Sequence, residues 1–166
     1  LNSIKIAYEE LREETGVVGI HFGESEETGK RIALIDPLGF PHHVPAHRCA
    51  FILQQKRPIL MKAFLELLRL GEREKGKRIL DAFIDLVVSR GRKGIWNKDE
   101  SFLRNYGFDG QKGVQIDIGS FYHKENGAAS IRDTMHPVRT WLGQTDPDML
   151  EHFDRSLEEK IAAAFP

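Results

Sequence analysis

The sequence predicts an α+β fold that is mostly helical. Three observations support this expectation: apolar residues recur at helical spacing in several segments, two short strand-like runs lie near the N-terminus, and an irregular, glycine-containing segment ends in a short strand. The chain has 166 residues, which suits one domain of ordinary size. Residues 77–89 carry the widest apolar stripe and are expected to form a buried central helix.

The N-terminal part of the chain predicts one helix followed by two strands. Residues 3–15 have helical spacing, with Ser3 as a cap and Gly16 as the stop. Residues 17–22 and 31–35 are rich in β-branched and other apolar side chains, with a polar stretch between them. We therefore expect these two strands to form a hairpin with each other.

The next part of the chain predicts an irregular segment and two helices. Residues 36–47 hold three prolines and one glycine, which favours an irregular backbone. A short helix is expected near residues 50–55. A longer helix is expected to begin at Pro58, which suits a first helical turn, and to end at Gly71.

The C-terminal half predicts an irregular segment between helices. The helical period is absent from residues 95–119, which close with a short strand at residues 114–118. This strand is expected to lie near the C-terminal end of the helix at residues 77–89. Residues 129–142 and 146–164 predict the last two helices.

Composition excludes several classes of partner and compartment. Lys plus Arg number 24 and Asp plus Glu number 25, so the net charge is -1 and no global basic field indicates nucleic-acid binding. No apolar run approaches the roughly 20 residues of a membrane helix, so no membrane partner is expected. The single cysteine, Cys49, and the lack of a visible signal peptide favour the cytoplasm.

The irregular segment holds the residue types that phosphoryl transfer requires. Asp99 is followed by Asn105, and then by Asp117 with Gly119 two residues later. One carboxylate can accept a hydroxyl proton, while an amide oxygen and a second carboxylate are hard ligands for Mg²⁺. The glycine allows a sharp turn next to the second carboxylate.

This order resembles the catalytic segment of the protein-kinase-like superfold, in which a long helix leads to a catalytic Asp, a metal-binding Asn and a D-F-G-like motif. The resemblance implies that Asp99 is the base and that Asn105 and Asp117 hold magnesium. Two departures are present. Asn97 stands where the motif has His, and Asp99 precedes Asn105 by six residues rather than five.

The resemblance extends toward the N-terminus. Residues 3–15 resemble helix C, so Glu9, Glu10 and Glu13 are candidates for the glutamate that pairs with a lysine near the nucleotide. Residues 36–40 resemble the hinge, which implies nucleotide contacts at Asp36 and Leu38.

The implied architecture is a kinase-like large lobe, with helix C and a two-stranded remnant of the small lobe. It forms a single kinase-like domain or fragment, with the small-lobe remnant at residues 1–36 and the helical lobe at residues 37–166. The whole sequence is most similar to uncharacterised kinase-like proteins of chlamydia-related bacteria, which imply no known substrate.

Two functions follow from the resemblance. The first is a phosphotransferase that uses ATP and magnesium, or the C-terminal part of one. The second is an inactive pseudokinase-type module that binds a protein partner. No Gly-rich loop or strand lysine is found before the first helix, so we expect these parts either before Leu1 or lost from a degenerate fold.

A separate cluster allows a third, different function. His42, His43, His47 and Cys49 are zinc-competent ligand types within eight residues, which leaves a metal-dependent hydrolase as an alternative. Their spacing matches no zinc motif, and two prolines stiffen the segment. We therefore expect that the three histidines do not share a metal ion.

Overall fold

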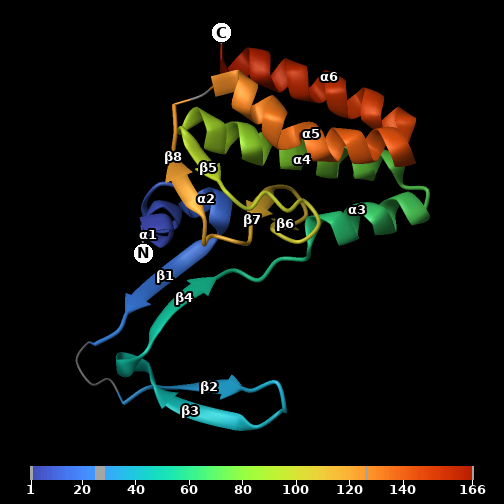
Figure 1. Cartoon of the computed structure of the whole chain (residues 1–166). Coiled ribbons are helices and arrows are strands. Elements are labelled where there is room, and N and C mark those ends of the chain that lie inside the picture. Colours follow the sequence, from blue (N-terminus) through green and yellow to red (C-terminus); the bar gives the residue numbers. More distant parts are fainter. Residues whose placement is uncertain (1, 25–28, 126, 166) are drawn as a thin grey trace. The chain divides into compact units, whose positions relative to one another are not determined.

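The computed structural model describes residues 2–24, 29–125 and 127–165, and it confirms the α+β class (Figure 1). The chain divides into two compact units. The larger combines Leu1–Gly16 with Lys56–Pro166, and the smaller is Val17–Gln55. The unit boundaries therefore follow Gly16 and Gln55, whereas the sequence predicted a division between residues 36 and 37. No helix in the described ranges is long and apolar enough to cross a membrane.

Four helices form most of the larger unit: α3 (Leu60–Arg69), α4 (Arg73–Arg92), α5 (Gly127–Thr145) and α6 (Pro147–Ala164). Helix α4 contacts each of the other three, and Figure 1 shows α4, α5 and α6 stacked side by side. The expected central helix is therefore confirmed, and it extends beyond the predicted residues 77–89 at both ends.

The apolar stripe of α4 explains its central position. Its buried side chains include Ile79, Leu80, Phe83, Ile84 and Val87, each at most 1% exposed. Burial on this scale stabilises a helix more than helix propensity does.

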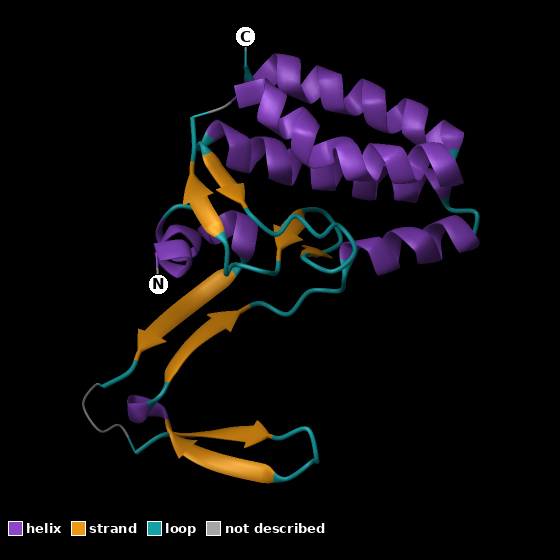
Figure 2. Ribbon diagram, in the orientation of Figure 1, coloured by secondary structure: helices purple, strands orange, loops and turns teal. Residues whose placement is uncertain are grey.

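Four short strands of the larger unit form two antiparallel pairs (Figure 2). Strand β5 (Ile95–Asn97) pairs with β8 (Phe121–His123), and β6 (Tyr106–Phe108) pairs with β7 (Gly113–Gln115). The strand predicted at residues 114–118 thus begins one residue earlier and ends at Gln115. As expected, β7 packs against α4.

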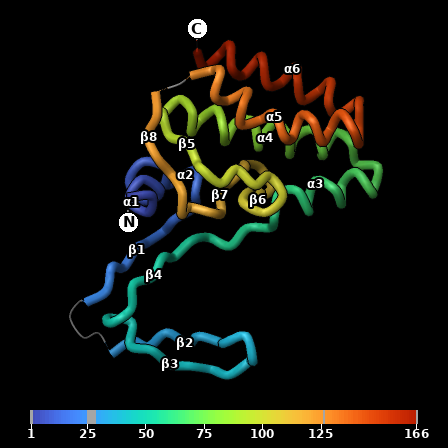
Figure 3. The backbone as a smooth tube through the Cα atoms, in the orientation of Figure 1, coloured from blue at the N-terminus to red at the C-terminus, as the bar shows by residue number. Residues whose placement is uncertain are grey.

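The predicted helix at residues 3–15 is broken. The structure has α1 (Asn2–Glu9) and a single turn, α2 (Arg12–Thr15), as the backbone path in Figure 3 shows. At the break, the Leu11 amide donates to the carbonyl oxygen of Ile6, five residues back, rather than four. The Thr15 hydroxyl donates to the Ala7 and Leu11 oxygens, which compensates for the lost helical bonds.

The smaller unit corrects the predicted hairpin. Strand β1 (Val17–Phe22) pairs with β4 (Ala50–Gln54), and β2 (Arg31–Ile35) pairs with β3 (Pro41–Pro45). Strand β2 pairs with β3, the next strand along the chain, because only the short turn at residues 36–40 separates the two. The 3-10 turn η1 (Ala46–Arg48) leads from β3 to β4.

The helix predicted near residues 50–55 is wrong, because these residues form β4. The run Phe51-Ile52-Leu53 suits a strand as well as a short helix, and a tertiary partner decides between them. That partner is β1, where the His21 ring stacks on Phe51 with ring centroids 5.0 Å apart. The segment at residues 41–45, predicted to be irregular, is also a strand.

Candidate functional site

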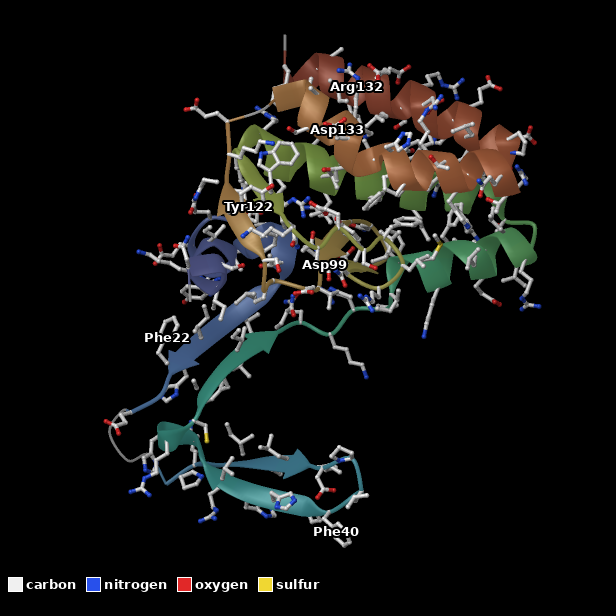
Figure 4. The ribbon with its side chains drawn as sticks, viewed as in Figure 1. Phe22, Phe40, Asp99, Tyr122, Arg132 and Asp133 are labelled. Carbon is white, nitrogen blue, oxygen red and sulfur yellow. The ribbon has the colours of Figure 1, made fainter. Side chains whose placement is uncertain are left out.

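Asp99, Asn105 and Asp117 lie in one cluster of loops in the larger unit. The Asn105 side chain donates from Nδ2 to the backbone oxygen of Asp99 at 3.0 Å. The Asn105 backbone oxygen accepts from the amides of Ile116 at 2.8 Å and Asp117 at 3.5 Å. The loop after β5, labelled at Asp99 in Figure 4, is therefore tied directly to the segment after β7.

Asn97 connects the same two loops through its side chain. Its Oδ1 accepts from the backbone amide of Asp99 at 2.9 Å, and its Nδ2 donates to the backbone carbonyl oxygen of Asp117 at 3.3 Å. Asn97 is 5% exposed. The sequence placed Asn97 where the kinase-like motif has His and gave it no role of its own. The signal for its positioning role is an Asx turn onto the residue two positions later.

The two carboxylates are each held through one oxygen. Asp99 Oδ1 accepts from the Ser101 amide at 3.2 Å, and Asp117 Oδ1 accepts from the Gly119 amide at 2.9 Å. Both residues are half-buried. The described part of the chain supplies no hydrogen bond to either Oδ2, so one oxygen of each carboxylate remains available to a ligand.

A buried polar network fixes these loops to α4. Arg90 is fully buried and donates to Gln115 and to Glu100. The Tyr106 hydroxyl donates to the other oxygen of Glu100, and burial raises the pKa of Tyr106 far above its usual value. The sequence does not predict this network, because nothing in the local pattern distinguishes Arg90 from a surface arginine.

The glutamates expected from the resemblance to helix C make their contacts outside the Asp99–Asn105–Asp117 cluster. Glu9 is exposed and pairs with Lys5 at 3.8 Å, while Glu10 bonds His123 at 3.0 Å. Glu13 lines a pocket between α2 and α4. It is Ser3 of α1 that reaches the segment after Asp117, because its hydroxyl donates to the Ile118 oxygen and accepts from the Phe121 amide.

The predicted hinge residues form the β2–β3 turn of the smaller unit. Asp36 Oδ1 accepts from the Leu38 and Phe40 amides, both at 2.9 Å, and Oδ2 bonds His42 Nε2 at 2.9 Å. The His42 hydrogen bond lowers the pKa of Asp36 below its usual value. The Leu38 side chain is 81% exposed. Asp36 therefore has a structural role in shaping a turn.

The histidines of the smaller unit are divided by the strand geometry. His42 and His43 are consecutive in β3, so their side chains point to opposite faces. His42 is engaged by Asp36, and His47 lies in the following turn. Across residues 2–24, 29–125 and 127–165, no group of three His, Cys, Asp or Glu side chains is placed to hold a metal ion.

The Asp99–Asn105–Asp117 cluster is chemically compatible with magnesium, which takes a few protein oxygens and keeps several waters. Because Asn105 Nδ2 is used by Asp99, the amide oxygen is the atom that remains for a cation. Asp117 adds a carboxylate oxygen from the neighbouring loop. No protein-family model, curated protein or solved structure matches this chain.

Proposed function

We propose that the protein is a phosphotransferase of kinase-like fold that uses ATP and magnesium, or the C-terminal part of one. The observation that carries this proposal is the hydrogen-bonded cluster of Asp99, Asn105 and Asp117. Three residues selected from the sequence for separate roles are linked through backbone and side-chain bonds in the folded chain. The resemblance to kinase-like proteins implies that the side chains of these residues face one site.

The order of elements around the cluster also supports the proposal. The long buried helix α4 leads into β5 and then into the loop with Asp99. The β6–β7 pair follows, and Asp117 lies directly after it. This is the sequence of helix, catalytic loop, metal-binding Asn and strand-delivered Asp in kinase-like proteins.

Each residue has a distinct chemical role in this proposal. Asp99 Oδ2 would accept the proton of the substrate hydroxyl, while the Ser101 amide holds Oδ1 in place. Asn105 and Asp117 would hold the metal, which supplies charge neutralisation at the transferred phosphoryl group. Asn97 is a positioning residue, since it acts on the backbone of both aspartates.

The proposal is tested by ligand-dependent thermal stability. Magnesium-ATP should raise the melting temperature of the wild-type chain, because a ligand that binds only the folded state stabilises it. Asp117→Asn should abolish this shift and leave the melting temperature without ligand almost unchanged. The matched control is Asp148→Asn, at an 86% exposed site in α6, which should keep the full shift. A shift that survives Asp117→Asn would contradict the proposed metal ligand.

The second candidate is a pseudokinase-type module that binds a protein partner. Two observations favour it: the expected helix C glutamates contact residues outside the cluster, and the smaller unit exposes large apolar side chains. Phe22 and Phe40, labelled in Figure 4, are 64% and 62% exposed. Absence of any magnesium-ATP shift in the wild-type chain would favour this function over phosphoryl transfer.

A further inference from the structure

Hydrogen bonds at both ends of the β2–β3 ladder show which backbone groups of β2 point away from β3. The Ala46 amide donates to the Lys30 oxygen at 2.9 Å, and the Asp36 amide donates to the Phe40 oxygen at 3.1 Å. Bonded and non-bonded residue pairs alternate along an antiparallel ladder, so the even-numbered residues of β2 face β3. The backbone groups that point outward belong to Arg31, Ala33 and Ile35.

The outer edge of β3 is closed to another strand. Its outward positions are Pro41, His43 and Pro45, which lie opposite the outward residues of β2. Proline has no N–H, so the two outer positions cannot donate to a neighbouring strand. At the central position, the His43 carbonyl oxygen accepts from the Arg31 guanidinium at 2.7 Å. The hairpin can therefore extend only through β2.

The outer edge of β2 is open, since β2 and β3 form a two-stranded sheet of their own (Figure 2). Arg31, Ala33 and Ile35 are all exposed, and the described residues supply no hydrogen bond to their outward N–H and C=O groups. Residues 32–35 are apolar and contain no proline, and Ile35 is 76% exposed. Native edge strands usually carry a charge, a proline or a bulge that prevents pairing. This edge thus has the properties of a strand that pairs with another strand.

The charges at the two ends of β2 select a second copy of this strand as the partner. Lys30 lies directly before the strand and Asp36 directly after it. In an antiparallel pair centred on Ala33, each Lys30 lies opposite the Asp36 of the other copy, which is a favourable arrangement of charges. A parallel pair in register would place like charges next to each other, which is unfavourable.

We propose that two copies of this chain pair through the outer edges of β2, antiparallel and about a twofold axis at Ala33. In this register the outward groups of Ala33 bond those of Ala33 in the other copy, and those of Arg31 bond those of Ile35. Ile32 lies opposite Leu34 of the other copy, so apolar side chains of both copies pack on one face. The sheet grows from two strands to four, which is more stable in water, and the closed edge of each β3 stops its growth there.

The first test measures the mass of the intact chain against concentration by sedimentation, with a reducing agent present to keep Cys49 a free thiol. One strand on each side makes a contact smaller than a standard interface, so we expect a reversible dimer with a Kd on the order of 10 µM to 1 mM. A chain that stays monomeric at about 1 mM, or that forms species larger than a dimer, would overturn the proposal.

The second test locates the contact by NMR over the same range of concentrations. The amide protons of Arg31, Ala33 and Ile35 should shift most, because their N–H groups gain a hydrogen bond on pairing. The amides of Ile32 and Leu34 serve as the control, since they already face β3. Concentration-dependent shifts centred outside β2 would exclude this edge as the interface.

The third test compares two proline variants at directly opposite positions of the hairpin. Ala33→Pro removes an outward N–H at the twofold axis, and His43→Pro removes the outward N–H across the ladder. Neither N–H takes part in the β2–β3 ladder. Ala33→Pro should weaken dimerisation by at least about tenfold, while His43→Pro, the matched control, should change it by less than about twofold. Equal effects of the two variants would contradict pairing through β2.

The fourth test uses charge at the axis and decides the outcome if Ala33→Pro does not fold. Ala33→Lys and Ala33→Glu each place like charges opposite each other in a homodimer, and Ala33 is exposed in the single chain. Each variant should self-associate about two- to fivefold more weakly than the wild type, and an equal mixture should form a heterodimer at least about fourfold tighter than either homodimer. A mixture that pairs no better than the separate variants would overturn the twofold arrangement.

Discussion

Arg90 has a structural role that its charge alone does not indicate. Its guanidinium is completely buried in the larger unit and bonds Glu100 and Gln115. These two partners lie on either side of Asn105 in the sequence, and the Gln115 side chain also donates to the Asn105 oxygen at 3.4 Å. Arg90 therefore holds both loops of the candidate site against α4.

Replacing Arg90 should destabilise the protein strongly. Arg90→Met should lower the free energy of unfolding by about 3–5 kcal/mol, because it leaves the Glu100 carboxylate partly buried and uncompensated. The double variant Arg90→Met, Glu100→Gln should recover part of this loss. Urea unfolding measures both values. Strictly additive losses would contradict the coupling between the two side chains.

Asp146 combines two local roles at the start of α6. Its Oδ1 accepts from the Met149 amide at 3.1 Å, which makes it the helix cap, and it forms a fork with Arg73 at 2.7 Å. The Arg73 bond lowers the pKa of Asp146 below its usual value. A lowered pKa in the folded state means that the ion pair stabilises the fold above the unfolded pKa of about 3.9.

This linkage predicts that the free energy of unfolding differs between the wild type and Asp146→Asn by an amount that depends on pH. The substitution keeps a capping side chain. The wild type should be more stable by about 1 kcal/mol at pH 7, and the difference should shrink as the pH falls below about 4. Urea unfolding at several pH values measures it. Asp148→Asn, the control at an 86% exposed partner of Arg73, should show a smaller difference, and a pH-independent difference would exclude the ion pair as its cause.

At the scale of elements, β7 and α4 approach each other closely because of Gly113. A Cβ at this position would lie 2.7 Å from the backbone oxygen of Ala82, which cannot move away without distorting α4. The close contact places Gln115, two residues later, within reach of Arg90. The glycine thus connects the strand before Asp117 to the central helix.

Gly113→Ala should therefore lower the free energy of unfolding by at least about 2 kcal/mol through overpacking. Gly143→Ala is the matched control in α5, where the nearest atom to a Cβ would be 3.5 Å away. That substitution should leave stability unchanged or raise it by up to about 1 kcal/mol, because alanine favours a helix. Denaturant unfolding compares them, and equal effects would contradict the close contact.

At the scale of the whole molecule, the two compact units differ in how they are stabilised. The larger unit buries a continuous apolar core around α4. The smaller unit consists of two separate two-stranded ladders, and several of its large apolar side chains are exposed: Phe22, Leu34, Ile35, Leu38, Phe40 and Leu53. Two-stranded ladders have little stability of their own in water.

This difference predicts unequal protection against amide hydrogen exchange. Amides of β2 and β3 should exchange at least about a hundredfold faster than those in the middle of α4, because opening a small ladder needs far less than global unfolding. Exchange followed by NMR or mass spectrometry measures the rates. Equal protection of the two units would show that the smaller one unfolds only together with the larger.

The sequence predicted the helices of the larger unit better than the strands of the smaller one. Apolar periodicity located α3, α4, α5 and α6 because a helix satisfies its backbone hydrogen bonds within its own segment. The pairing of β1 and β2 was wrong because strands take their partners from elsewhere in the chain, and local pattern does not specify which strand is chosen.

The sequence by itself determined the α+β class and the central buried helix. The shared metal site of Asn105 and Asp117 stays a prediction. Only the tertiary structure decided the strand partners, the break between α1 and α2, the burial of Arg90 and the unsatisfied oxygen of Glu14. The physical reason is the sequence separation of the interacting residues. Periodicity indicates only which face of one segment is apolar. Strand pairing, the burial of a charge and an unsatisfied acceptor depend on residues brought together from distant parts of the chain.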